Sequence, residues 1–146
     1  MLSKYFAIKS NYYNVVPISK EIRLFLVENF INETDCNDVE ICIMETLNNV
    51  IKHSYNEVDN NEIFIETIID KNELKIIVDD KGISRKNITK PTLEYDPNNI
   101  MDLPESGMGL YIIDQLMDDT KYYIKDGINT FVMKKAVALN RAYEKI

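Results

Sequence analysis

The sequence has few of the residues that build metal centres and disulfide frameworks, with only two cysteines and one histidine. Cys36 and Cys42 lie six positions apart without a companion ligand cluster, so they indicate neither kind of site. No apolar run approaches the roughly 20 residues of a membrane-spanning helix. The N-terminal residues MLSKYFAIKS also lack the apolar core of a secretion signal. We therefore expect a cytoplasmic protein with reduced cysteines and no membrane partner.

Positive charge is in deficit as well. The chain has 17 lysines and arginines against 24 aspartates and glutamates, for a formal net charge of −7. An acidic surface opposes binding to a phosphate backbone, so no direct nucleic-acid partner is expected. The charge is compatible with docking onto a basic partner, although solubility alone also explains it.

Glycine and proline number only four each, so their positions carry information. Three of the prolines fall in the segment 81–106, which shows no clear hydrophobic periodicity. A structureless segment of this length inside a compact domain is usually functional or mobile. We expect a lid over about residues 83–106.

Hydrophobic periodicity predicts the other elements. Strands are expected at residues 2–9, 62–69, 74–79 and in a closing hairpin around Gly127. Helices are expected over residues 16–30, from Asp35 or Asn37 to about His53, and after Pro104. This order predicts an α+β fold in which helices cover a mostly antiparallel sheet in a two-layer α/β sandwich. Residues 1–146 would form a single domain, with a core of about 5–135 and a short C-terminal appendage.

The segment PESGMGLYIIDQLMDD places Gly107 and Gly109 at the start of an amphipathic helix. Glycine costs a helix interior up to about 1 kcal/mol relative to alanine. In the first turn, however, it allows an anion such as a phosphate to approach the unpaired backbone N–H groups. When this segment is taken alone, a hinge or cap that happens to hold two glycines is the favoured explanation.

The expected second helix contains IMETLNNVIKHSY, and its polar residues share one narrow sector. These residues are Glu45, Asn49, Lys52 and His53. A polar stripe of this kind is typical of any solvated amphipathic helix. If the stripe faces a cavity instead, the carboxylate and carboxamide one turn apart could act as a base and a Mg²⁺ ligand. His53 is a candidate ligand, although a structural hydrogen bond explains it more simply.

The segment IIVDDKGIS places Asp80 at the end of an apolar strand, with Gly82 two residues later. A carboxylate at this position can accept a hydrogen bond from an exocyclic amine, and the glycine clears space beside it. Aspartate and glycine are also ordinary turn residues, so the pair alone is a weak signal.

Taken in order, the three segments resemble the ATP-binding fold of histidine kinases, type II topoisomerases and heat-shock chaperones, known as the GHKL or Bergerat fold. ETLNNVIKH resembles its N box, DDKG its first glycine box and SGMGLYIIDQLMDD its second. Within this superfamily the chain is most similar to the bacterial anti-sigma factor serine/threonine kinases, over residues 5–135. The first glycine box departs from the family pattern where it continues as GISRKN.

This resemblance implies a homodimer that binds ATP with Mg²⁺, holds a sigma factor inactive and phosphorylates a serine on an anti-anti-sigma protein. Carried over by position, Glu45 would be the general base and Asn49 the Mg²⁺ ligand. Asp80 would bind the adenine amine and Gly82 would line the base pocket. The other implied nucleotide-binding residues are Lys52, His53, Gly107, Met108, Gly109, Leu110 and Thr130, the last with a slip of one residue left open.

Three other functions remain open. A catalytically inactive ATP-binding interaction module would keep the pocket and use ATP as a switch for partner affinity. A histidine-kinase catalytic fragment would need a phosphoacceptor histidine on a separate helix, whereas His53 lies within the nucleotide-site helix. A nucleotide-free interaction protein would leave the paired glycines and the lid without explanation.

Overall fold

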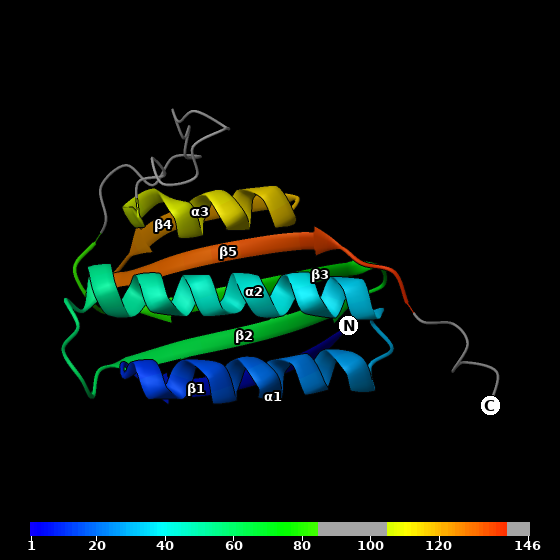
Figure 1. Ribbon diagram of the computed structural model, residues 1–146, viewed down its shortest axis with the longest axis horizontal. Coiled ribbons are helices and arrows are strands. Elements are labelled where there is room, and N and C mark those ends of the chain that lie inside the picture. Colours follow the sequence, from blue (N-terminus) through cyan, green and yellow to red (C-terminus); the bar gives the residue numbers. More distant parts are fainter. Residues whose placement is uncertain (85–104, 140–146) are drawn as a thin grey trace.

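The computed structural model describes residues 1–84 and 105–139, without the side chains of residues 105–107. Within this part of the chain, three α-helices lie side by side over one face of a five-stranded sheet (Figure 1). The elements are β1 (Leu2–Lys9), η1 (Tyr12–Asn14), α1 (Val15–Glu28), α2 (Glu33–Asn49), η2 (Val50–Ser54), β2 (Glu62–Asp70), β3 (Glu73–Asp80), α3 (Glu105–Leu116), β4 (Asp119–Lys125) and β5 (Ile128–Ala136). The predicted α+β two-layer sandwich is confirmed.

The strands follow the order β1-β2-β3-β5-β4, and every neighbouring pair is antiparallel. Successive residues of a strand point to opposite faces of the sheet. In β3 this alternation turns Leu74, Ile76 and Val78 toward the helices, where they are buried. Asp80 is the next residue in the same series, so the strand carries its carboxyl group to the buried face as well.

Helix α2 begins earlier than its sequence predicts. The Asn32 side chain accepts a hydrogen bond from the Asp35 N–H at 2.8 Å and so caps the helix. Glu33 and Asp35 then lie in the first turn, where negative charge is favourable next to the helix dipole. The expected cap at Asp35 or Asn37 was therefore wrong, because the cap lies upstream at Asn32.

The core lies between the sheet and the helices, and α2 contacts both α1 and α3. The largest fully buried side chains of the core are Ile22, Leu26, Val39, Ile43, Leu47, Ile51, Ile63, Ile65, Leu74, Ile76, Ile113 and Met133. Cys36 and Cys42 are buried and free. No helix in the described ranges is long and apolar enough to cross a membrane.

The chain after β5 returns to the start of α2. Asn32 N donates to Ala138 O at 2.9 Å, and Ala138 N donates to Asp35 Oδ2 at 2.9 Å. An antiparallel bridge joins Ile31 to Leu139. The expected C-terminal appendage beyond residue 139, and the expected lid between residues 85 and 104, lie outside the described residues.

Candidate functional site

Helix α3 meets α2 at Gly109. A Cβ atom at this glycine would lie 2.7 Å from Glu45 Oε2 and 3.3 Å from Asn49 Nδ2. Glu45 and Asn49 therefore both face the N-terminal half of α3. This arrangement is the one required if the polar stripe of α2 faces a cavity rather than solvent. Helix α3 begins at Glu105, so Gly109 is its fifth residue and lies later in the helix than the sequence predicted. The absence of a side chain at Gly109 allows the carboxylate and the carboxamide to reach this part of the helix.

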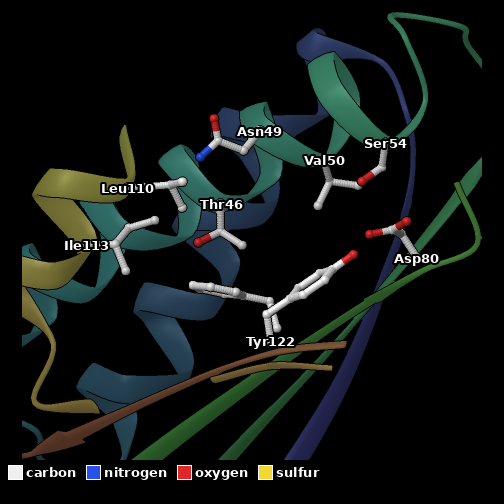
Figure 2. A pocket seen from close by; sticks show the side chains of 9 residues that line it. Thr46, Asn49, Val50, Ser54, Asp80, Leu110, Ile113 and Tyr122 are labelled. Carbon is white, nitrogen blue, oxygen red and sulfur yellow. The ribbon is translucent and has the colours of Figure 1, made fainter. Parts of the chain in front are cut away.

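A pocket lies between α2, α3 and the sheet (Figure 2). It contains about 350 Å³ of empty space, including its open mouth. Its lining residues are Thr46, Asn49, Val50, Ser54, Asp80, Leu110, Ile113, Tyr122 and Phe131. Tyr122 and Phe131 are direct cross-strand partners on β4 and β5. A pocket of this size, mostly apolar with a few polar groups, is typical of a small-molecule site.

Asp80 is the charged group of this pocket, and it is only 4% exposed. Its Oδ1 accepts hydrogen bonds from Gly82 N at 2.9 Å and from Asn129 Nδ2 at 2.8 Å. Burial raises the pKa of Asp80 above its usual value, while hydrogen bonds from Asn129, Gly82 and Ser54 oppose the rise. The result is a buried carboxyl group that accepts hydrogen bonds at the edge of the pocket, where Ser54 points toward it (Figure 2).

Gly82 fixes how the chain leaves β3. A Cβ atom on this residue would lie 2.2 Å from Ser54 O, so any side chain would collide with the backbone of η2. The contact is reinforced by a hydrogen bond of 2.7 Å from Ile83 N to Ser54 O. Gly82 therefore shapes the pocket through the backbone of its wall, and it does not itself line the pocket.

The helix containing Glu45 changes its geometry after Asn49. Residues Val50–Ser54 form a π-helical turn, which is wider than an α-helical turn and is often found at functional sites. The turn places Ser54 in the pocket, whereas Lys52 is exposed and His53 is half-buried, and neither lines the pocket. The structure thus brings Glu45 and Asn49 to the site but separates Lys52 and His53 from the pocket wall.

On β5 the structure brings Asn129, rather than Thr130, to the pocket side. Asn129 is paired with Asp80 across the sheet and shares its buried face. The Thr130 hydroxyl points to the opposite face and donates to Asp79 Oδ1 at 2.6 Å. Strand alternation, once the register with β3 is known, is the signal that separates these two neighbours.

The start of α3 is described in part. Leu110 lines the pocket, Met108 is half-buried beside it in sequence, and the surroundings of Gly107 lie outside the described part of the structure. Sequence reasoning missed six lining residues, namely Thr46, Val50, Ser54, Ile113, Tyr122 and Phe131. Helical spacing from Leu110 could have indicated Ile113, but the aromatic pair depends on the pairing of β4 with β5.

A family profile described as "Histidine kinase-like ATPase domain" matches residues 8–135. The chain belongs to the histidine kinase-like ATPase domain family. Membership agrees with the fold and with the order of the three motifs along the chain.

Two curated members of similar sequence are the serine-protein kinases RsbW of Bacillus thuringiensis (strain Al Hakam) and Bacillus cereus (strain 03BB102). Each is 36% identical to this chain over 103 residues, which covers 68% of this chain and 64% of the relative. The match therefore spans less than two thirds of the length of these kinases.

Two solved structures share the fold. One contains the RsbU and RsbW domains of a Mycobacterium tuberculosis protein, with a TM-score of 0.65 at 14% identity, over 94% of this chain and 33% of the other. The second is the SiaB–SiaC complex of Pseudomonas aeruginosa, with a TM-score of 0.57 at 13% identity, over 91% of this chain and 89% of the other. At such low identity these matches establish the architecture alone.

The donor set fits a magnesium nucleotide. The side chains of Glu45 and Asn49 both lie within 3.6 Å of the same point beside Gly109, so their oxygen atoms converge. The described residues contain no cluster of three or more histidine, cysteine, aspartate or glutamate side chains that could hold a metal alone. Magnesium commonly takes one or two protein ligands and completes its shell with water and substrate phosphates, which suits this sparse pair.

Proposed function

We propose that this chain is an ATP-dependent serine kinase and anti-sigma factor. It binds ATP with Mg²⁺, transfers a phosphoryl group to a serine of an anti-anti-sigma protein, and sequesters a sigma factor. The observation that carries the proposal is that the Glu45 and Asn49 side chains converge beside Gly109 in the N-terminal half of α3. Similarity to the serine-protein kinases RsbW supports the choice of a serine acceptor.

The nucleotide base occupies the apolar part of the pocket in this proposal. Asp80 accepts a hydrogen bond from the exocyclic amine of adenine, and its burial makes that bond effective because little water competes for it. Leu110, Ile113 and the Tyr122–Phe131 pair supply the apolar surface around the base. The triphosphate extends from this pocket toward the first turn of α3.

The first turn of α3 binds the phosphates. Its backbone N–H groups have no partner within the helix and carry the positive end of the helix dipole. Gly107 and Met108 belong to this turn, and Gly109 and Leu110 follow it, where the missing side chain of Gly109 leaves room beside Glu45. Anionic oxygens are therefore bound next to the proposed base.

Glu45 acts as the general base for transfer. Its carboxylate accepts the proton of the acceptor serine while that serine oxygen bonds to the γ-phosphorus and the bond to the ADP oxygen breaks. Asn49 would hold Mg²⁺ together with the phosphate oxygens, and the ion would supply charge neutralisation. Positioning and charge stabilisation dominate such transfers, so the site needs few reactive side chains.

The test uses Glu45→Gln, with Glu33→Gln in the exposed first turn of α2 as the matched control. ATP binding is measured by calorimetry with and without Mg²⁺, and transfer is measured with radiolabelled ATP and an anti-anti-sigma protein from the same organism. Glu45→Gln should bind ATP but lose at least 100-fold in transfer rate. The control should retain both properties.

The outcomes distinguish an active kinase from an inactive ATP-binding module and from a protein that binds no ATP. Transfer that survives in Glu45→Gln would remove Glu45 from the catalytic role. Loss of both binding and transfer would show that Glu45 is structural. A wild-type protein that binds ATP but labels no serine would be an inactive ATP-binding module, and one that binds no ATP with saturating Mg²⁺ would not be a kinase.

We further propose that the protein works as a cytoplasmic homodimer without direct contact to nucleic acid or membrane. The acidic net charge of −7 supports the absence of nucleic-acid contact. Sedimentation equilibrium with and without ATP measures the mass, and a monomer at micromolar concentration in both states would contradict the dimer.

A further inference from the structure

Asn129 is a buried amide that uses both ends of its side chain. Its Nδ2 donates to Asp80 Oδ1 at 2.8 Å and to Gly82 O at 3.0 Å. Its Oδ1 accepts a hydrogen bond of 2.7 Å from the hydroxyl of Ser84. The residue is 1% exposed, and its bond to Asp80 is buried, whereas the bonds to Gly82 and Ser84 are part-buried.

The two bonds from Nδ2 favour one orientation of the amide. If the amide were turned over, its oxygen would face the Asp80 carboxylate and the Gly82 carbonyl, so two acceptors would meet a third acceptor in place of their shared donor. An unpaired buried polar group costs roughly 1–3 kcal/mol. The Ser84 hydroxyl could bond either end of the amide, so it does not select the orientation, but its bond to Oδ1 holds the side chain in place.

The orientation of Asn129 determines how Asp80 meets a ligand. Asn129 and Gly82 both donate to Oδ1, and Ser54 is a further hydrogen-bond partner of the carboxyl group, so lone pairs of the second oxygen are not used by the Asn129 and Gly82 bonds. A carboxylate held in this way offers an acceptor to the pocket. A purine with a 6-amino group can donate to it, whereas a purine with a 6-oxo group presents a second acceptor.

We propose that Asn129 is a positioning residue that, held by Ser84, keeps Asp80 as an acceptor and so sets a preference for 6-amino over 6-oxo purine nucleotides. The inference rests on the proposed function, since it assumes that the base lies in this pocket. It also gives a role to Ser84, the position at which the first glycine box departs from the family pattern. Asn129 acts through Asp80.

The experiment compares ATP with inosine triphosphate by calorimetry at saturating Mg²⁺. The two nucleotides differ in the 6-substituent and in the proton on N1 that accompanies the 6-oxo group, so the ratio of their dissociation constants reports the hydrogen bonds at this edge of the base. The wild-type protein should prefer ATP by at least about 100-fold, because the wrong base leaves a buried acceptor unpaired. Asn129→Leu should reduce this ratio by about tenfold, and Ser84→Ala by a smaller factor.

Three further variants separate positioning from a structural role. Asn129→Thr keeps a hydroxyl donor beside Asp80 and should restore part of the ratio. Thr67→Val changes a buried residue on the same face of the sheet, away from the pocket, and should leave the ratio at the wild-type value. Thr130→Val tests the neighbouring residue, which bonds to Asp79 on the opposite face.

A second measurement does not need a nucleotide. The Asp80 carboxyl carbon is followed by NMR against pH in the wild-type protein, Asn129→Leu and Ser84→Ala. The hydrogen bond from Asn129 lowers the pKa of Asp80, so its loss should move the titration to higher pH. Ser84 is exposed, so Ser84→Ala should fold normally. The Asp80 titration can therefore still be measured in Ser84→Ala if Asn129→Leu does not fold.

An equal loss of affinity for both nucleotides in Asn129→Leu, with the ratio unchanged, would overturn the inference. A changed ratio in Thr130→Val alone would overturn it as well. If the wild-type protein bound neither nucleotide, the proposed function and the base preference would both fail. In that case an Asp80 pKa that is unchanged in Asn129→Leu would also exclude the positioning contact, and a raised pKa would establish it.

Discussion

At the residue scale, Asp80 is a carboxylate in a position where folding alone would favour an uncharged group. It continues the buried face of β3 beyond Val78, and its burial raises its pKa. The ionised form is thus less favourable in the folded chain than in the unfolded chain. Stability linked to the protonated form is fully present below the ordinary pKa of aspartate and is lost as the pH rises through the raised pKa.

Asp80→Asn is expected to separate stability from binding. The amide oxygen of the variant can still accept the bonds from Gly82 N and Asn129 Nδ2, and the cost of the buried charge is removed. The melting temperature at pH 7 should be equal to or above that of the wild-type protein, while ATP binding is lost. Calorimetry and thermal unfolding check this, with Asp70→Asn at the exposed end of β2 as control. A variant that still binds ATP would exclude the proposed contact.

The same carboxyl group predicts a pH dependence of binding. The ionised form accepts the amine of adenine, so ATP affinity should fall as the pH drops through the raised pKa of Asp80. The fall should begin at a higher pH than for an ordinary exposed aspartate. Calorimetric dissociation constants across the acid range measure the midpoint. A midpoint at or below the usual aspartate value would contradict this expectation.

Thr67 is a second buried polar residue on the helix-facing side of the sheet. Its Oγ1 has no hydrogen-bond partner among the described residues, and the side chain is 0% exposed. Thr67→Val keeps the shape and removes the unpaired hydroxyl, so the free energy of unfolding should rise by about 1 kcal/mol. Urea denaturation measures the change. A loss of stability would mean that a bound water satisfies the hydroxyl in solution.

At the element scale, two glycines set how close neighbouring elements come. Gly82 lets the end of β3 touch η2, and Gly109 lets the start of α3 touch α2. The atoms they approach differ in kind. At Gly82 the nearest atom is the backbone oxygen of Ser54, whereas at Gly109 it is the end of the flexible Glu45 side chain.

Alanine at these two positions should therefore act differently. Gly82→Ala places a Cβ 2.2 Å from Ser54 O, and relieving this clash by shifting η2 should lower the free energy of unfolding by about 1–3 kcal/mol. Gly109→Ala can be accommodated if Glu45 rotates, so the fold should persist while phosphoryl transfer falls sharply. Urea denaturation and the transfer assay test the pair. Equal destabilisation of both variants would contradict the argument.

Lys135 ties three elements together at the other end of the helices. Its Nζ donates to Leu116 O at the end of α3 at 2.8 Å. The same atom lies 3.9 Å from Asp35 Oδ1 and 3.7 Å from Asp38 Oδ2 on α2. The lysine is on β5, so one largely buried cation links the sheet to both helices. None of the residues in these contacts lines the pocket. The contacts instead fix the positions of α2 and α3, which carry several of the lining residues.

At the scale of the whole molecule, ligand binding and folding are linked. A ligand that binds only the folded state stabilises it by RT ln(1 + [L]/Kd). With ATP at 100 times its dissociation constant and saturating Mg²⁺, the free energy of unfolding should rise by about 2.7 kcal/mol. The rise should persist in Glu45→Gln and be absent in Asp80→Asn. Denaturant titrations with and without ATP measure it, and an equal rise in both variants would place ATP elsewhere.

Sequence periodicity and motif order predicted much of the molecule. The two-residue alternation of β2 and β3, the helical spacing of α1 and α2, and the glycine pair at the start of α3 are local patterns. Each depends on neighbours within one element, so each can be interpreted without coordinates. The choice of Glu45, Asn49 and Asp80 as candidate residues came from the same local patterns.

The tertiary structure decided which of these candidates meet. The helical wheel grouped Lys52 and His53 with Glu45, but the π-helical turn after Asn49 breaks that geometry and brings Ser54 to the pocket instead. Asn129 rather than Thr130 reaches Asp80 because the register between β3 and β5 assigns each to its face. Register and helix packing depend on residues far apart in the chain, so local sequence determined the elements and their chemistry, whereas long-range pairing determined the site.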